Sequence, residues 1–507
     1  MGLNVGPELD LIPRTIASPG VAEDCESLAS KGAKGDQNLA WQPSAIAADI
    51  VTLGAGTLLA GLFNAAIVFV VPKLLSVEAY GYWRLFVLYS GYVGFLHFGF
   101  ADGALLRWAG KSWGEFHHEI GPAAKYLLWQ HVLVIAPLCF AALLLPRTLW
   151  FVAIGICLFS FVMNEVTLLQ MGLQCGKIFR PFAISNVAAP GLFLAFVLAW
   201  YFAGHVDYRL VICSFIAGWL CALIFLLVRT KPWPTGDQIR VRPVDLVENC
   251  LRAGWPIVLA NTGVNLIQYA DRLAVSWAAS IQNFALYSLA ASAMGVPITI
   301  IQACSSVFFS HLADIDSRRR KQVYTDSTHV LLFAWALLLP YYFALDAFVH
   351  RFLPHYVPSI EYARILLLGV PFIAVVQILQ MNYAYLSGMQ RRFFVQTACM
   401  LVASLAITAF AAFELDALRM VAEAQVIALA LWWLSNEWTI RRATGVTAQD
   451  QLGFMIIYVL VSLIYWFTSG FGFGRELMAI CVYYPVICLI FAAAAWGKLR
   501  IQKKQLA

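Results

Sequence analysis

Residues 210–228 read LVICSFIAGWLCALIFLLV, a run without a single charged side chain. A run of this length can cross about 30 Å of hydrocarbon as one helix. The rest of the chain is similar, because 61% of its 507 residues are hydrophobic, 12% are charged and the mean hydropathy is +0.75. Soluble proteins carry roughly 25% charged residues, so the composition excludes a soluble globular protein and a disordered chain. Apolar runs of about 20 residues also exclude an outer-membrane barrel of alternating ten-residue strands.

The sequence therefore predicts an all-α polytopic membrane protein with about 14 transmembrane helices. Six lie in a first lobe, at 48–72, 80–103, 123–145, 149–172, 182–204 and 210–228. Six more lie in a second lobe, at 250–275, 283–310, 328–350, 361–386, 393–414 and 416–438, and a last pair lies at 452–470 and 478–497.

The same pattern divides the chain into segments. They are a flexible cytoplasmic tail (1–47), an N-lobe (48–228), a cytoplasmic linker (229–249), a C-lobe (250–440), an extra helix pair (441–497) and a basic cytoplasmic tail (498–507). The first segment lacks the basic start, short apolar core and small-residue cleavage site of a secretory signal.

The net charge of +6 is distributed unevenly over the predicted loops. One set of loops, which includes both ends of the chain and the cluster at 318–321, holds about 25 Lys and Arg residues, against about 8 in the other set. The positive-inside rule places both termini in the cytoplasm. Because the basic excess reports topology, we expect no nucleic-acid partner.

Motifs of soluble enzymes occur only out of context. Asp314-Ile315-Asp316 matches a metal-binding pattern of glycosyltransferases, but it lies in a basic turn with no nucleotide-binding α/β domain around it. His117-His118-Glu119 has no further metal ligands nearby, and no phosphate-binding P-loop is present. We therefore expect a protein that is not an enzyme and needs no cofactor or metal.

An internal repeat relates the two lobes. The first predicted span is followed by Leu75-Ser76-Val77-Glu78-Ala79-Tyr80-Gly81-Tyr82, and the seventh by a turn that runs from Ala279 to Ser288. In both, a short turn leads through aromatic and small residues into the next span. Repeats of six spans keep the same orientation, so the sequence predicts two parallel six-helix bundles around a central cavity.

These residues resemble those of a known family. The Tyr80-Gly81 turn, the helix end Gly99-x-x-x-Gly103-x-x-x-Arg107, the Gly254-Trp255-Pro256 start of a span and the Pro354-His355-Tyr356 turn are similar to those of polysaccharide-repeat-unit (Wzx-like) flippases. These flippases belong to the multidrug/oligosaccharidyl-lipid/polysaccharide (MOP) exporter superfamily. The resemblance covers roughly 48–440 and implies alternating access of two lobes that moves undecaprenyl-pyrophosphate-linked oligosaccharides across the bacterial inner membrane.

Ionisable groups inside a membrane usually face a cavity or a partner, which makes three of them candidates. Arg84 can offer a fork of hydrogen bonds to a pyrophosphate; the alternative is that it snorkels to the outer surface. Asp271 is a candidate for substrate contact and for ion coupling, or else half of an interfacial ion pair with Arg272. Glu165 is a candidate for ion coupling, although a structural role is the simpler interpretation for it and for Glu423.

Amide side chains form a second group of candidates. Asn261, Asn265 and Gln268 are spaced by four and three residues, which places them on one helix face, and Asn64 occupies a similar place in the first lobe. Amides suit a neutral glycan because they donate and accept hydrogen bonds without charge; the alternative is hydrogen bonding between helices. Polar residues of the tenth span are less regular; they are Gln377, Gln380 and Asn382.

The expected function is a lipid-linked oligosaccharide flippase for exopolysaccharide or O-antigen biosynthesis. Its expected partners are the lipid-linked oligosaccharide, membrane lipid, a polysaccharide polymerase and a chain-length regulator. The last helix pair lies outside the repeat, and a groove for the polyprenyl tail is one use for it. The alternatives are an ion-coupled small-molecule or drug exporter of the same superfamily, an integral-membrane polysaccharide polymerase or ligase, and a scaffold without transport activity.

Overall fold

A computed structural model describes residues 43–232, 243–295, 297–298, 301, 319–415 and 417–506. Within these ranges all the regular secondary structure is helical. Eleven helices are long and apolar enough to cross a membrane. This confirms the predicted all-α polytopic membrane protein. Residues 1–42, residues 233–242 of the linker, the end of the eighth predicted span and Asp314–Asp316 lie outside the described ranges.

The N-lobe begins with a long helix and continues with a broken second span and four further helices. Its elements are α2 (Pro43–Leu74), α3 (Val77–Ser90), η1 (Val93–His97), α4 (Phe100–Trp108), α5 (Trp113–Ala142), α6 (Arg147–Cys175), α7 (Phe179–Phe202) and α8 (Tyr208–Thr230). Buried aromatic rings pack its interior, as where Trp83 stacks on Phe193 with ring centroids 5.3 Å apart.

The C-lobe starts at a second broken span. Its elements are α9 (Pro243–Gln268), α10 (Ala270–Ala278), α11 (Ile281–Ser292), α13 (Arg320–Leu338), α14 (Tyr341–Phe352), η3 (Pro354–Tyr356), α15 (Ser359–Leu366), η4 (Leu367–Gly369), α16 (Val370–Ala374), the π-helix η5 (Val375–Gln380), α17 (Met381–Leu386), α18 (Gln390–Phe413) and α19 (Leu418–Thr444). The last pair is α20 (Ala448–Ser469) and α21 (Glu476–Leu506).

Several helices are longer than the predicted spans. The first helix begins at Pro43 and α9 at Pro243, so each takes in residues assigned to the tail or the linker. At the other end, α21 continues to Leu506 through the predicted basic tail. Hydropathy marks only the part of a helix that lies in hydrocarbon, and polar turns at its ends are invisible to it.

The second span is interrupted rather than continuous. Helix α3 ends at Ser90, and the chain turns through η1 to Phe98 and Gly99, whose φ angles are 49° and 81°. Side chains from neighbouring helices satisfy the carbonyls that the break frees: Asn164 donates to Val93 (3.0 Å) and Gln130 to Leu96 (3.2 Å). Irregular backbone persists at membrane depth only when protein groups satisfy it in this way.

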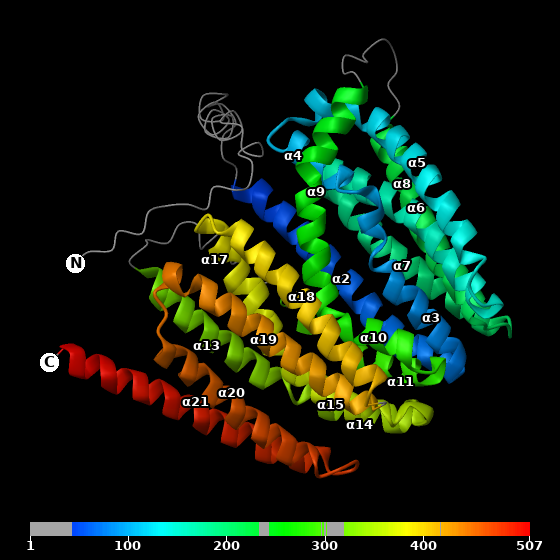
Figure 1. Ribbon diagram of the computed structural model, residues 1–507. Helices are drawn as coiled ribbons and strands as arrows, with labels where there is room; N and C mark the ends of the chain where they lie inside the picture. Colours follow the sequence, from blue (N-terminus) through cyan, green and yellow to red (C-terminus); the bar gives the residue numbers. More distant parts are fainter. Residues whose placement is uncertain are drawn as a thin grey trace, which may run out of the picture.

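The seventh span is also broken, between α9 and α10. The break falls at Tyr269, and Gln425 of α19 donates to the Ile267 carbonyl beside it at 3.0 Å. The first half of this span packs on the N-lobe helix α4 and on α18, whereas the second half packs on α18, α11 and α19 of its own lobe. Figure 1 shows α9 running from the N-lobe end beside α4 down to α10 among the C-lobe helices.

Small residues allow α4 and α9 to touch backbone to backbone. A Cβ atom added to Gly103 would lie 1.8 Å from the Cys250 carbonyl oxygen, and one added to Gly254 would lie 1.8 Å from that of Gly99. Helices in membranes associate through such close approaches. The glycines of the Gly-x-x-x-Gly-x-x-x-Arg pattern therefore pack one lobe on the other, while Arg107 forms a bidentate ion pair with Glu119 (2.7 and 3.0 Å).

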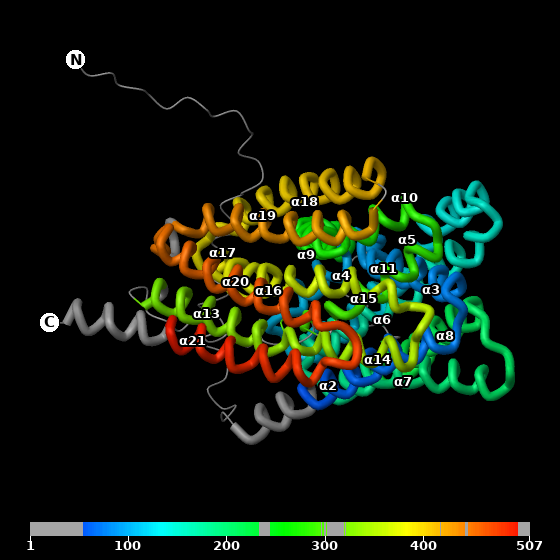
Figure 2. Tube along the Cα trace, turned by 90° about the horizontal axis from the view of Figure 1, so that it is seen from below, coloured from blue at the N-terminus to red at the C-terminus, as the bar shows by residue number. Residues whose placement is uncertain are grey.

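Figure 1 shows the last helix pair along the outer edge of the C-lobe, and Figure 2, seen from below, shows it beside α13. Hydrogen bonds attach it to that lobe: Tyr483 of α21 donates to the Ala336 carbonyl (2.8 Å), and Arg364 of α15 donates to Ser469 of α20 (2.6 Å). The pair is thus an extension of the C-lobe.

Candidate functional site

The lobes meet where α3 packs on α11, and these two helices start in the same way. Ser76 caps α3 by accepting the Ala79 amide (3.2 Å), and Ser280 caps α11 by accepting the Asn283 amide (3.3 Å). When the two caps are aligned, Arg84 of the N-lobe matches Ser288 of the C-lobe. The repeat expected from the sequence thus extends to the capping of both helices.

Contacts across this interface close the α3–α11 end of the molecule. Tyr89 of α3 accepts a hydrogen bond from the Trp277 indole (2.8 Å), and its hydroxyl also lies 3.1 Å from the Ser276 hydroxyl. Tyr80 packs edge-on against Tyr356, with ring centroids 5.5 Å apart. A Cβ added to Gly81 would lie 2.4 Å from the Ile281 carbonyl oxygen, so the two helices are in direct contact here.

Arg84 lies inside this interface. Its Nε is buried and has no hydrogen-bond partner within the described ranges. The ionisable groups that interact with it are Tyr80, Arg272 and Tyr269. Arg84, the side chain predicted to bind a pyrophosphate, therefore lies beside a second guanidinium, that of Arg272. The Nε of Arg84 is turned into the protein rather than to the surface.

Arg272 and Asp271 occupy the start of α10. Arg272 is 9% exposed, donates to the Ala291 carbonyl (3.2 Å) and lies 4.4 Å from the Tyr269 ring centroid. Asp271 is 1% exposed and accepts the Tyr287 hydroxyl at 2.8 Å. Asp271 and Arg272 interact electrostatically, and neither is in a salt bridge with any residue that the structure describes. The Asp271 carboxylate interacts with Arg272, whereas Arg84 interacts with Arg272 and two tyrosines. One carboxylate and two guanidiniums leave a positive surplus.

Buried polar atoms without hydrogen-bond partners gather around these three residues. Within the described part of the chain they include Arg84 Nε, Arg272 Nε, Asp271 Oδ1 and the hydroxyls of Ser90, Tyr92, Ser288 and Tyr356. Tyr92 also interacts electrostatically with Arg272 and Asp271. Buried polar groups are normally satisfied, so this set of atoms is suited to hydrogen-bonding a polar ligand that enters between the lobes.

The amide candidates divide into exposed and buried positions. Asn64 on α2 and both Asn261 and Asn265 on α9 are exposed, so they are available to a ligand. Gln268 is 4% exposed and donates to the Val264 carbonyl of its own helix (3.2 Å). Gln268 is therefore buried, so it does not share the exposed polar helix face of Asn261 and Asn265 that the spacing predicts.

The two acidic residues predicted within spans have different surroundings. Glu165 on α6 is 6% exposed, and its Oε1 has no partner among the described residues. Glu423 is exposed and pairs with Arg419 one turn away (2.9 Å). Glu165 remains a candidate for ion coupling, whereas Glu423 forms an ion pair at the surface.

Polar residues of the tenth span serve the C-lobe interior. Asn382 donates to the Ile378 carbonyl (2.9 Å), and both Gln377 and Gln380 are buried. Gln380 donates to Glu437 of α19 at 2.8 Å. Sequence reasoning did not single out Glu437, which is 3% exposed, nor its second partner Tyr324.

The fold is similar to the folds of several solved membrane transporters. It matches a solved structure described as "Lipid II flippase MurJ, inward closed conformation" with a TM-score of 0.68 and 12% identity, over 89% of this chain and 99% of that one. It also matches an inward-facing MATE-family multidrug resistance transporter of the MOP superfamily (TM-score 0.57, 12% identity, 79% and 100% covered). A third match is a MOP-superfamily transporter from Pyrococcus furiosus (TM-score 0.56, 13% identity, 78% and 95% covered).

Residues 125–354 match a family model described as "Polysaccharide biosynthesis protein". No match to a curated protein is found. The family model covers less than half of the chain, and the solved structures show a similarity of fold. They agree with the resemblance seen in the sequence.

Proposed function

We propose that this protein is a flippase that moves undecaprenyl-pyrophosphate-linked oligosaccharide repeat units across the bacterial inner membrane. The observation that carries the proposal is a pair of guanidiniums with free hydrogen-bond capacity between two lobes of a MOP-type fold. Arg272 is buried, and Arg84 is half-buried with a buried Nε. The polysaccharide biosynthesis family and the lipid II flippase named among the solved structures support a lipid-linked glycan as the substrate.

Each group of site residues has a separate role in this proposal. Arg84 and Arg272 bind the pyrophosphate, because a guanidinium presents paired donors to phosphate oxygens. Asn64, Asn261 and Asn265, with Gln268 at the break, bind sugar hydroxyls. Asp271 and Glu165 couple transport to an ion, since each is a buried carboxylate with a free oxygen.

Both termini lie in the cytoplasm in this proposal, so the α3–α11 end faces outwards. The structure is then closed on the outside by the contacts of Tyr89 and Tyr80. Alternating access requires these contacts to break while the opposite ends of the lobes approach each other. We expect a polysaccharide polymerase and a chain-length regulator to act on the product in exopolysaccharide or O-antigen assembly.

An ion-coupled drug exporter is the second candidate, because MATE-family multidrug transporters have the same fold. A deletion strain distinguishes the two. The flippase proposal predicts that lipid-linked repeat units accumulate in the inner leaflet and that wild-type protein reverses this. An unchanged leaflet distribution, together with increased sensitivity to hydrophobic cations, would contradict the flippase proposal and favour the exporter.

A further inference from the structure

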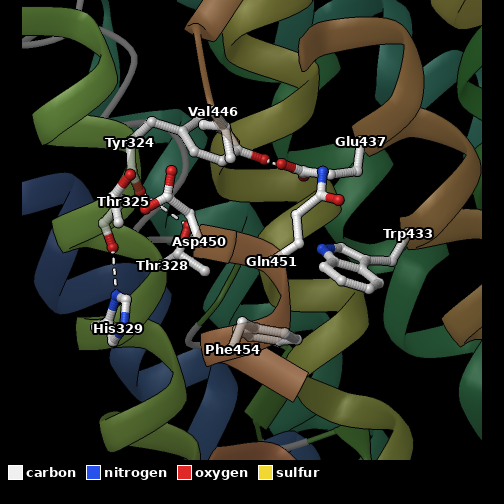
Figure 3. Close-up of a pocket in the computed structure, with 10 residues that line it drawn as sticks. All are labelled: Tyr324, Thr325, Thr328, His329, Trp433, Glu437, Val446, Asp450, Gln451 and Phe454. Carbon is white, nitrogen blue, oxygen red and sulfur yellow. Dashed lines mark hydrogen bonds between the residues drawn. The ribbon is translucent and has the colours of Figure 1, made fainter. Parts of the chain in front are cut away.

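Glu437 is a buried carboxyl group far from the site between the lobes. It lies near the end of α19, where the C-lobe meets the last helix pair, and is 3% exposed. Figure 3 shows Tyr324 of α13 and Gln451 of α20 converging on it from two sides. The proposed transport site between the lobes does not involve this group.

Three neutral side chains hydrogen-bond to the carboxyl. The Tyr324 hydroxyl donates to Oε2 at 2.5 Å, and the Gln380 amide donates to the same oxygen at 2.8 Å. Gln451 makes a further side-chain hydrogen bond to Glu437. These partners belong to α13, the π-helix η5 and α20, so one carboxyl joins three elements that are distant in sequence.

The neighbouring basic side chains that the structure describes are engaged elsewhere. Lys321 of α13 pairs with Asp450 of α20 (3.4 Å), and Arg441 lies over the Trp438 ring, 6.0 Å from its centroid. His329 of α13 shares a short hydrogen bond with the Thr325 carbonyl (2.6 Å). The remaining titratable neighbour is Tyr383 of α17, whose ring packs edge-on against Tyr324. No described cation therefore neutralises Glu437 at ion-pair distance.

The partners of Glu437 can serve both of its protonation states. A hydroxyl or an amide donates to an ionised carboxylate and can also accept from a protonated carboxyl, which a lysine or arginine cannot do. A purely structural carboxylate in a membrane protein is normally held by a cation, because an unpaired charge there is costly. The all-neutral shell is therefore suited to reversible protonation.

A cavity connects the carboxyl with polar groups nearer the surface. Its lining includes Glu437, Tyr324, Thr328, His329, Gln451 and Asp450. The Lys321–Asp450 pair at its edge is partly exposed, with side-chain exposures of 47% and 28%. Polar atoms thus lead from partly exposed positions to the buried carboxyl.

We propose that Glu437 is a proton-binding site, loaded and released through this cavity. Protonation removes the charge that holds Tyr324, Gln380 and Gln451 around one point, and so loosens the attachment of α20 to α13 and α19. With the predicted orientation, the cavity lies on the cytoplasmic side. The inference goes beyond the proposed transport function and does not depend on which substrate is moved.

A matched pair of variants tests the proposal in the full-length protein in lipid nanodiscs. Glu437→Gln keeps the shape and hydrogen-bonding capacity but cannot titrate, and Glu423→Gln is the same change on the exposed part of α19. We expect infrared difference spectra across a pH titration to show a buried carboxyl in the wild type and in E423Q that is lost in E437Q. Glu423→Gln should retain the wild-type thermal unfolding temperature at every pH. Glu437→Gln should unfold like the wild type with Glu437 protonated, because both lack the charge.

Two further measurements distinguish a proton site at Glu437 from a metal-cation site and from a carboxyl elsewhere in the chain. Tyr324→Phe should shift the midpoint of the titration without abolishing it, because Tyr324 positions a hydrogen bond on the carboxyl. Glu165 and Asp271 are also buried carboxyls and can contribute signals of their own. The proposal would be overturned if the carboxyl signals of E437Q were the same as those of the wild type. A signal that responds to replacing potassium by sodium at constant pH would also overturn it, because the site would then bind a metal cation.

Discussion

Arg84 shows how a single side chain determines what the site can bind. A half-buried guanidinium with an unused N–H and a second guanidinium nearby attracts an anion that supplies several acceptor oxygens. Asp271 compensates only part of this charge, since its Oδ2 is already engaged by Tyr287. We therefore expect an anionic group, and not a hydrophobic cation, to be the preferred ligand between the lobes.

Replacing Arg84 by alanine should reduce transport of a pyrophosphate-linked substrate by about tenfold to a hundredfold. The loss corresponds to roughly 1.5–3 kcal/mol, the contribution of a hydrogen bond to a charged group. Arg209→Ala is the matched control, because Arg209 is exposed at the start of α8 and lies 3.8 Å from Asp207. Transport rates of the two variants at equal expression provide the test, and equal rates would remove Arg84 from the site.

Sequence alone could identify Arg84 and Asp271, because charges inside apolar runs stand out. It could not distinguish Glu437 from Glu423, which lie on the same helix with opposite surroundings. Glu423 is exposed beside Arg419, whereas Glu437 is enclosed by Tyr324 and Gln451 from helices that are distant in sequence. Burial created by such distant partners has no local signature in the sequence.

Among the elements, continuous spans were predictable and interrupted spans were not. The second span contains no charged residue between Arg84 and Asp102, so hydropathy predicts one continuous helix there. The glycines at 91, 94 and 99 are the local signal for the turn. The break depends on Asn164 and Gln130, which satisfy its carbonyls from two other helices. The seventh span is similar, since Gln425 of α19 supports the end of α9.

The backbone contact between α4 and α9 is the element-level feature most sensitive to substitution. Gly103→Ala would force a methyl group against the Cys250 carbonyl oxygen, so we expect a destabilisation of roughly 1–3 kcal/mol. Gly453→Ala in α20 is the control, because its Cβ would meet nothing within 4 Å; the change there should be neutral or stabilising by up to about 1 kcal/mol. Thermal unfolding in detergent measures both, and equal unfolding temperatures would show that the contact is loose.

For the whole molecule, the two lobes touch through a small number of polar contacts at the α3–α11 end. Tyr89 alone accepts from Trp277 and contacts Ser276. A transporter that alternates between two states needs interfaces that can break, and hydrogen bonds of about 1 kcal/mol each are suitable for this purpose. The similar starts of α3 and α11 were predictable from sequence, whereas nothing in the sequence specifies the conformational state.

Tyr89→Phe should shift the equilibrium away from the state closed at the α3–α11 end. Loss of two hydrogen bonds of about 1 kcal/mol each changes the ratio of states by roughly tenfold or more. Tyr82→Phe is the control, because Tyr82 stacks on Tyr208 within the N-lobe. Spin-label distances between the lobes report the populations, and a distribution unchanged by Tyr89→Phe would mean that these bonds do not hold the closed state.

Reconstitution of the purified protein tests the central claim most directly. Proteoliposomes would carry a fluorescent undecaprenyl-pyrophosphate-linked oligosaccharide, and a membrane-impermeant quencher would report the leaflet that holds it. We predict that wild-type protein moves the label between leaflets and that Arg209→Ala does so equally well, while Arg84→Ala moves it at least tenfold more slowly. Movement no faster than in protein-free liposomes, by a correctly folded wild-type protein, would contradict the flippase assignment.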